Sequence, residues 1–251
     1  VMSGAVSRTG LPDQPIRTAV PYVDYATALS LTIGAMMALY HRNATGAGQE
    51  VEAALLPSAL MMSNALLIEQ SILQQNRGRI GNKGMAIGPS DLFRMRDGWI
   101  LVQVTGQPMF KRWCRLVGEE GWFEDSRFAN DQLRAVNGDV LNERMQQWCG
   151  DKTIAQAMEK LDEARLSAAP MLSLQEAIED PHVQAMGYLK PVDYPGLPHP
   201  APLIETPFRM SATPGTIRSR PPLLGEHTDE LLRELGFDAA AVAGLRALEV
   251  V

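Results

Sequence analysis

The strongest constraint on the fold is a helical pattern near the start of the chain that ends in a double-glycine turn. The pattern covers Asp24–Arg42 and is rich in small residues, which suit a helix packed closely against its neighbours. The turn Asn43–Gln49 follows, and a short alternating run, Glu50–Leu55, leads into a second apolar pattern over Ser58–Gln75. Pro57 fits the first turn of that second helix, where a missing N–H is not needed. The sequence therefore predicts two helices that pack on each other.

Composition and charge restrict the class of protein. The chain has 251 residues, 45% of them hydrophobic, and a formal net charge of −6. Binding to a phosphate backbone requires clustered positive charge, so we expect no nucleic acid as a partner. The first five residues lack the basic flank and apolar core of a signal peptide. The longest apolar run, Ala26–Tyr40, is broken by polar residues and is shorter than a membrane span. We therefore expect a cytoplasmic protein that does not bind a membrane.

The two cysteines do not predict a metal site. Cys114 and Cys149 are far apart, each follows a tryptophan, and no CxxC or Cys/His ligand spacing occurs. Two isolated cysteines are more often buried thiols in a reducing compartment than a disulfide, although the sequence alone leaves both open. We expect no bound metal.

The character of the sequence changes after residue 75. The segment Asn76–Gly88 contains four glycines with three basic residues between them. Two strands are predicted next, Asp91–Met95 and Trp99–Val104, and Asp97-Gly98 favours a tight turn between them, because this dipeptide permits positive φ angles. Helical patterns follow at these positions: Pro108–Gly118, Asn130–Gly150, and Thr153–Ala164 with Thr153 as its N-cap.

The last part of the chain is rich in proline. Ala177–Pro222 carries a high share of the 17 prolines and is predicted to be an extended strap with one short strand at Phe208–Met210. Its apolar side chains gain nothing from exposure to water, so we expect the strap to lie against another surface. A capped helix at Gly225–Gly236 and a short helix at Ala239–Ala247 are predicted to complete the chain.

Short blocks in a fixed order resemble those of a known family. The first consists of the opening helix, the glycine turn and Glu50–Leu55, and the later ones are Gly81-Asn82, Pro89, Asp91-Leu92-Phe93, Asp97-Gly98-Trp99-Ile100, Asp180-Pro181-His182-Val183, Pro207–Ser211 and Pro221–Thr228. Each block alone is weak. Together they resemble the class III CoA-transferases (the CaiB/BaiF type), which include formyl-CoA transferases, carnitine CoA-transferases and α-methylacyl-CoA racemases. The opening block lies well inside those proteins, so the chain is similar to the C-terminal portion of a member.

The resemblance implies an α/β fold with a large Rossmann-like domain and a smaller α+β domain, in two subunits that interlock as a homodimer. On this division, residues 1–75 are the C-terminal part of the large CoA-binding domain, and 76–90 are a glycine-rich linker. Residues 91–170 form the small α+β domain. Residues 171–251 are an extended return linker with terminal helices that pack on the large domain.

The resemblance also implies the chemistry. In the family, one aspartate attacks the thioester and forms acyl-aspartyl and aspartyl-CoA intermediates, which splits one transfer into easier steps. It lies shortly before a Ser-Gly…Thr-Gly turn, here Ser3-Gly4 and Thr9-Gly10, so we expect it upstream of Val1 and expect this chain alone to be inactive. Asp24 is interpreted as a helix N-cap instead. The implied substrates are an acyl-CoA and a carboxylic acid, with the CoA thioester as substrate and no tightly bound cofactor.

The glycine-rich segment supplies most of the candidate substrate-binding residues, namely Gly78, Gly81, Asn82 and Gly84. Glycine backbone can approach a ligand closely and can offer N–H donors to a developing oxyanion. The alternative is an ordinary flexible linker. Gln107 is the fifth candidate, because it falls near a position where the racemases carry an acid–base glutamate. Glutamine cannot transfer a proton.

The sequence thus predicts an acyl-CoA:carboxylate CoA-transferase. One alternative is an α-methylacyl-CoA racemase or epimerase, against which Gln107 argues. Another is a non-catalytic fragment or partner subunit. The acyl group and the acceptor acid are not encoded in any residue pattern found here.

Overall fold

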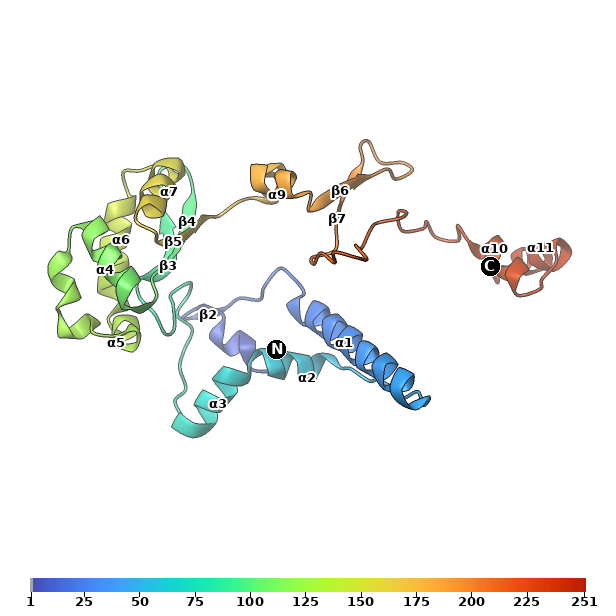
Figure 1. The fold of residues 1–251 in the computed structure, drawn as a ribbon, viewed down its shortest axis with the longest axis horizontal. Helices are drawn as coiled ribbons and strands as arrows, with labels where there is room; N and C mark the ends of the chain where they lie inside the picture. The colour runs from blue at the N-terminus through green and yellow to red at the C-terminus, as the bar shows by residue number, and fades with distance from the viewer. Residues whose placement is uncertain (1) are drawn as a thin grey trace. The chain divides into compact units, whose positions relative to one another are not determined.

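The chain divides into two compact units, and Met171 is the last residue of the first (Figure 1). A computed structural model describes residues 2–251. All strand pairs among these residues are antiparallel. The described residues therefore contain no parallel sheet of the kind found in a Rossmann-like core.

The first unit begins with short elements and then three helices. The 3₁₀ helix η1 (Ala5–Arg8) precedes a two-stranded hairpin, and the helices follow it along the chain. Their bounds are β1 (Gly10–Leu11), β2 (Gln14–Pro15), α1 (Tyr22–Thr45), α2 (Leu55–Met62) and α3 (Asn64–Leu73). The helices α1 and α2 contact each other, as the sequence predicted.

The predicted N-cap of α1 is wrong. The helix begins at Tyr22 with Pro21 at the N-cap position, and no side chain caps it. Asp24 lies in the first turn instead, where a negative charge is favoured by the helix dipole. At the other end Gly46 has φ 80°, and its N–H donates to the Arg42 carbonyl at 2.8 Å.

The predicted helix Ser58–Gln75 is two helices. It breaks at Ser63, whose backbone (φ −98°, ψ 5°) leaves the helical region between α2 and α3. Pro57 does lie in the first turn of α2, as predicted.

By length and composition alone, α1 could cross a membrane, since it has 24 residues and a sufficiently apolar stretch. This differs from the sequence expectation, which counted only the shorter run Ala26–Tyr40. A helix covered by other protein surfaces has the same properties.

A three-stranded antiparallel sheet organises residues 90–170. Its strands are β3 (Ser90–Arg94), β4 (Trp99–Gln103) and β5 (Ser167–Pro170), with β4 in the centre. Phe93 pairs with Ile100, and Leu101 pairs with Ala169. Ile100 and Val102 are buried while the residues that alternate with them are not, so one face of the sheet is covered.

The hairpin between β3 and β4 is confirmed, but its turn is not of the predicted type. Neither Asp97 nor Gly98 has a positive φ. The turn closes when the Met95 N–H donates to the Gly98 carbonyl at 2.9 Å. The Asp97 carboxylate accepts the Ile154 N–H at 2.8 Å, so the turn is fixed by the helix that starts there.

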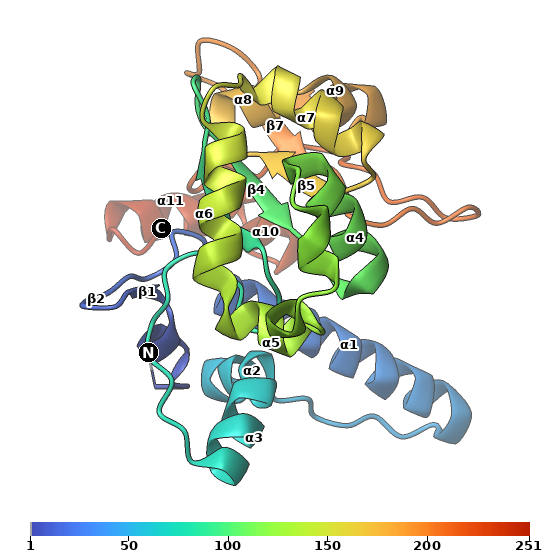
Figure 2. The same ribbon diagram turned by 90° about the vertical axis from the view of Figure 1, so that its left-hand side faces the viewer.

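Helices cover the buried face of this sheet (Figure 2). Their bounds, with the short elements between them, are α4 (Gly106–Val117), η2 (Glu120–Phe123), η3 (Ser126–Phe128), α5 (Asp131–Val136), α6 (Gly138–Cys149) and α7 (Ile154–Glu163). The predicted helix Asn130–Gly150 is divided into α5 and α6 at Asn137. Thr153 caps α7 in a capping box with Gln156, which confirms the predicted N-cap.

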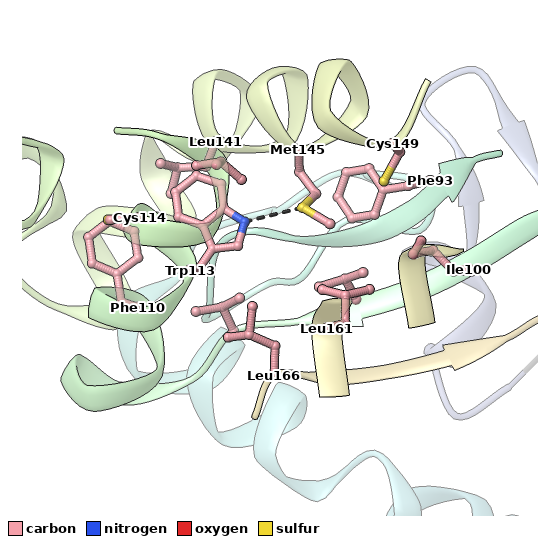
Figure 3. Close-up of a cluster of buried hydrophobic side chains, with 14 of the residues drawn as sticks. Phe93, Ile100, Phe110, Trp113, Cys114, Leu141, Met145, Cys149, Leu161 and Leu166 are labelled. Carbon is pink, nitrogen blue, oxygen red and sulfur yellow. Dashed lines mark hydrogen bonds between the residues drawn. The ribbon is translucent and has the colours of Figure 1, made fainter. Parts of the chain in front are cut away.

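The hydrophobic core lies between the sheet and these helices (Figure 3). Trp113 is fully buried, stacks on Phe110 with 5.6 Å between ring centroids, and donates its indole N–H to the Met145 sulfur at 3.2 Å. Cys114 and Cys149 are free thiols in this core. Burial raises the pKa of both to about 12, so they stay protonated and contribute packing.

The second unit contains more regular structure than the predicted strap. Its elements are α8 (Leu174–Glu179), α9 (Pro181–Met186), β6 (Leu189–Val192), β7 (Ala201–Ile204), α10 (Thr228–Glu234) and α11 (Ala239–Ala247). Strands β6 and β7 form a hairpin, and the strand predicted at Phe208–Met210 is absent. The last helix has the predicted bounds. The side-chain cap predicted for the helix before it is absent, because His227 occupies the N-cap position without a capping bond.

Candidate functional site

The glycine-rich segment (residues 76–90) is held at its first half by the β1–β2 hairpin. The Gly81 N–H donates to the Gly10 carbonyl at 2.9 Å. The Arg79 guanidinium donates to the carbonyls of Leu11 and Pro12, both at 2.8 Å. Gly81 has φ 68°, a region that favours glycine. This half is therefore fixed by backbone acceptors.

The second half of the glycine-rich segment is held by α6. The Gly84 N–H donates to the Ser90 carbonyl at 2.9 Å, and the Ser90 N–H donates to Asn142 Oδ1 at 3.1 Å. Lys83 Nζ forms an ion pair with Asp139 at 2.5 Å. The two halves are thus anchored to two different parts of the first unit.

Between these two anchors, the backbone N–H groups are available to a ligand. Gly84 and Ser90 are bonded, but the N–H groups of Met85–Gly88 have no hydrogen-bond partner among residues 2–251. Four consecutive unpaired N–H groups can stabilise an oxyanion if the segment faces one.

Gly88 lies directly against the backbone of Arg134. A Cβ at position 88 would be 2.7 Å from the Arg134 carbonyl oxygen and 3.1 Å from its carbonyl carbon. Since neither backbone atom can rotate away, only glycine fits here.

Arg134 is the most buried charged residue of the first unit, with 1% of its side chain exposed. It forms an ion pair with Asp131 and donates to Gln107 Oε1 at 3.0 Å and to the Phe128 carbonyl at 2.9 Å. Its guanidinium also lies 4.5 Å from the centre of the Phe110 ring. A buried charge is tolerated because it is paired and hydrogen-bonded in this way.

Asp131 connects this arginine to the start of α4. Its carboxylate accepts the Gly106 N–H at 3.0 and 3.1 Å. Partial burial acts to raise its pKa, but the hydrogen bonds from Arg134 and Gly106 and the arginine charge prevail, so the pKa is lowered.

Gln107 is oriented by the same network. Its Oε1 accepts from Arg134, and its Nε2 donates to the Ala129 carbonyl. Among residues 2–251 no hydrogen bond joins Gln107 to Gly78, Gly81 or Gly84. Asn82 is exposed. Gln107 is thus an exposed side chain held by two hydrogen bonds, and substrate binding by these five residues stays a prediction.

Sequence reasoning missed the buried ion pair. Its signal is the i,i+3 spacing of Asp131 and Arg134, which is common on exposed helices and does not reveal burial. Among residues 2–251 no group of three or more histidine, cysteine or acidic side chains could hold a metal ion.

Comparison with known proteins places this arrangement in a family. A sequence model described as CoA-transferase family III matches residues 1–228. The chain is 31% identical over 245 residues to the beta subunit of succinyl-CoA–L-malate CoA-transferase from Chloroflexus aurantiacus, covering 96% of this chain and 60% of that protein. It is 32% identical over 265 residues to formyl-CoA:oxalate CoA-transferase from Bradyrhizobium sp., covering 96% and 62%.

Solved structures share the fold. A CaiB/BaiF family protein from Brucella suis superposes with a TM-score of 0.75 at 25% identity, covering 93% of this chain and 61% of that one. A protein from M. tuberculosis superposes with a TM-score of 0.74 at 22% identity, covering 91% and 58%. The fold is thus that of the CaiB/BaiF proteins. The chain belongs to CoA-transferase family III, and it spans about 60% of the length of the curated relatives it matches.

Gly88→Ala should destabilise the first unit by about 1–3 kcal/mol, because the added methyl group meets fixed backbone. Gly78→Ala is the matched control, since nothing lies within 4 Å of its Cβ position. Urea unfolding followed by circular dichroism measures both. Equal stability of the two variants would show that the Gly88–Arg134 contact is not close.

Asp131→Asn should cost about 2–3 kcal/mol near neutral pH, less than a fully buried pair because Asp131 is 33% exposed. Because folding lowers the Asp131 pKa, its stabilisation is complete above the ordinary pKa of 3.8 and is lost as pH falls through the lower folded value. The gap between variant and wild type should therefore shrink below about pH 4. Glu163→Gln, which removes an ion pair whose two side chains are 53% and 60% exposed, is the control and should show little change. A gap that is independent of pH would contradict the ionic role.

Proposed function

We propose that this chain is the C-terminal portion of an acyl-CoA:carboxylate CoA-transferase. The observation that supports it is the family match along almost the whole chain, with two curated CoA-transferases at 31% and 32% identity. The name of each relative describes the transfer of CoA from one carboxylic acid to another. The same class of substrates, an acyl-CoA and a free acid, is proposed here.

The proposed mechanism uses a nucleophilic aspartate that lies outside residues 1–251. Its carboxylate attacks the thioester carbonyl, the C–S bond breaks, and an acyl-aspartyl anhydride forms with CoA thiolate as the leaving group. The thiolate then attacks the aspartyl carbonyl, which leaves an aspartyl-CoA thioester and the free donor acid. The acceptor carboxylate then attacks the aspartyl-CoA thioester, which forms an anhydride between aspartate and acceptor and releases CoA thiolate. The thiolate attacks the acceptor carbonyl of this anhydride, which gives the new acyl-CoA and regenerates the aspartate.

The role proposed for this chain is to stabilise the oxyanion of each step. The unpaired N–H groups of Met85–Gly88 support it, because they are preorganised by the anchors at Gly84 and Ser90. Gln107 does not support racemase chemistry, since an amide bound to Arg134 and Ala129 cannot act as a general acid or base.

Full-length protein incubated with an acyl-CoA and an isotopically labelled free acid should produce labelled acyl-CoA, measured by mass spectrometry. Residues 1–251 expressed alone should give none. Asp24→Asn in the full-length protein tests the first suspect inside this chain: unchanged turnover is expected for a nucleophile outside residues 1–251, and lost turnover would assign the role to Asp24. Loss of an α-proton to deuterated water without CoA exchange would instead indicate a racemase. Turnover by residues 1–251 alone would place the nucleophile inside this chain.

We also propose a homodimer. Many large apolar side chains are exposed in the single chain, and those of α1 include Tyr25 (63%), Ile33 (62%), Met37 (66%) and Tyr40 (79%). Phe208, in the proline-rich part of the second unit, is 61% exposed. Soluble monomers rarely expose this many large apolar side chains along one helix.

Light scattering on the full-length protein at micromolar concentration should give twice the mass of one chain. The buried area should exceed the roughly 1,600 Å² of a standard interface. A clean monomer at that concentration would contradict the proposal.

A further inference from the structure

A cavity of about 300 Å³ lies between η1, α3 and the first residues of the glycine-rich segment. It belongs entirely to the first unit. Its lining combines polar side chains from η1 and the segment with two leucines of α3, Leu66 and Leu67. This size is at the lower end of small-molecule sites, too small for a whole CoA thioester.

Two buried serines line this cavity without partners. Ser3 and Ser63 are each 5% exposed, and neither hydroxyl makes a hydrogen bond to residues 2–251. Both hydroxyl oxygens remain accessible from the cavity, so each can donate a hydrogen bond to a bound polar group.

Arg8 brings an uncompensated positive charge to the same cavity. Among residues 2–251, the Arg8 side chain makes one hydrogen bond, from Nη2 to the Met85 sulfur at 3.1 Å. A thioether is a weak acceptor. The Arg8 Nε is buried and has no hydrogen-bond partner in the described part of the chain. Arg77 also lines the cavity, but Glu69 pairs with it at 2.7 Å. No acidic side chain is part of the lining.

We propose that this cavity binds a small carboxylate, with the carboxylate against Arg8 and the hydroxyls of Ser3 and Ser63, and with a short carbon chain against Leu66 and Leu67. An oxyanion is the group that satisfies a guanidinium and two hydroxyl donors together. The leucines favour a carboxylic acid over inorganic phosphate, which has no apolar part. The assignment of this acid as the acceptor of the transfer rests on the proposed function, whereas its binding does not.

Arg8 also contacts the part of the glycine-rich segment that carries the unpaired N–H groups, through Met85. A carboxylate on Arg8 would therefore lie beside the stretch proposed to hold the oxyanion. This juxtaposition is why the cavity suits the acceptor acid.

Isothermal titration calorimetry on the full-length protein tests the proposal, with succinate, its neutral diamide succinamide, and inorganic phosphate as probes. Succinate should bind at one site per chain, and succinamide should not. Arg8→Gln should weaken succinate binding at least tenfold, while Arg8→Lys, which keeps the charge, should weaken it less. Arg17→Gln, at an exposed arginine, is the matched control and should leave binding unchanged. Circular dichroism establishes that each variant is folded.

Succinate binding that is insensitive to Arg8→Gln, or no binding at all, would overturn the site. Tight phosphate binding with none for succinate would overturn the carboxylate assignment. In the transfer assay, Arg8→Gln should raise KM for the acid and leave KM for the acyl-CoA unchanged. If the protein binds succinate through Arg8 but transfers no CoA, the proposed function fails and the anion site stands.

Discussion

The buried ion pair of Arg134 and Asp131 is the interaction on which the arrangement of the first unit depends. The guanidinium joins η3, α4 and α5, while the carboxylate fixes the first N–H of α4. The Arg134 carbonyl also lies against Gly88, so the same residue limits how the glycine-rich segment can enter the sheet. Breaking such a pair leaves one buried charge uncompensated, which explains why the whole network must form together.

The glycine-rich segment is ordered by hydrogen bonds at both of its ends. A linker of four glycines would be mobile if it were free, but here its halves are bonded to the β1–β2 hairpin and to α6. Only Met85–Gly88 lacks backbone partners among the described residues. The segment is thus held at both ends, and the N–H groups between the two anchors remain free to donate to a ligand, which is the basis of the proposed oxyanion role.

The sequence predicted the longer helices and the β3–β4 hairpin, because periodicity and caps are local signals, but not the short elements such as β5 and the β6–β7 hairpin. The strands around Asp97-Gly98 and the capping box at Thr153 follow from neighbouring residues alone. The helix break at Ser63 was missed because no glycine or proline marks it, and tertiary packing decides where such a helix ends. The break at Asn137 had a local signal, the Asn137-Gly138 dipeptide, which the sequence analysis did not use.

The candidate site was predictable only in part. The glycines between Gly78 and Gly88 stand out in the sequence, and the family resemblance made them the first candidates for substrate binding. Gln107 was selected from the same resemblance, yet its contacts with Arg134 and Ala129 depend on long-range packing that no local pattern records. The unpaired hydroxyls of Ser3 and Ser63 likewise become visible only when burial is known.

Amide hydrogen exchange on the full-length protein, resolved to single residues, tests the central claim most directly. The N–H groups of Gly81, Gly84 and Ser90, which are hydrogen-bonded, should exchange slowly, and those of Met85–Gly88 should exchange fast. Within the glycine-rich segment, addition of an acyl-CoA should slow exchange at Met85–Gly88. Protection of Met85–Gly88 before ligand is added, or exchange there that a saturating acyl-CoA leaves unchanged, would contradict the account.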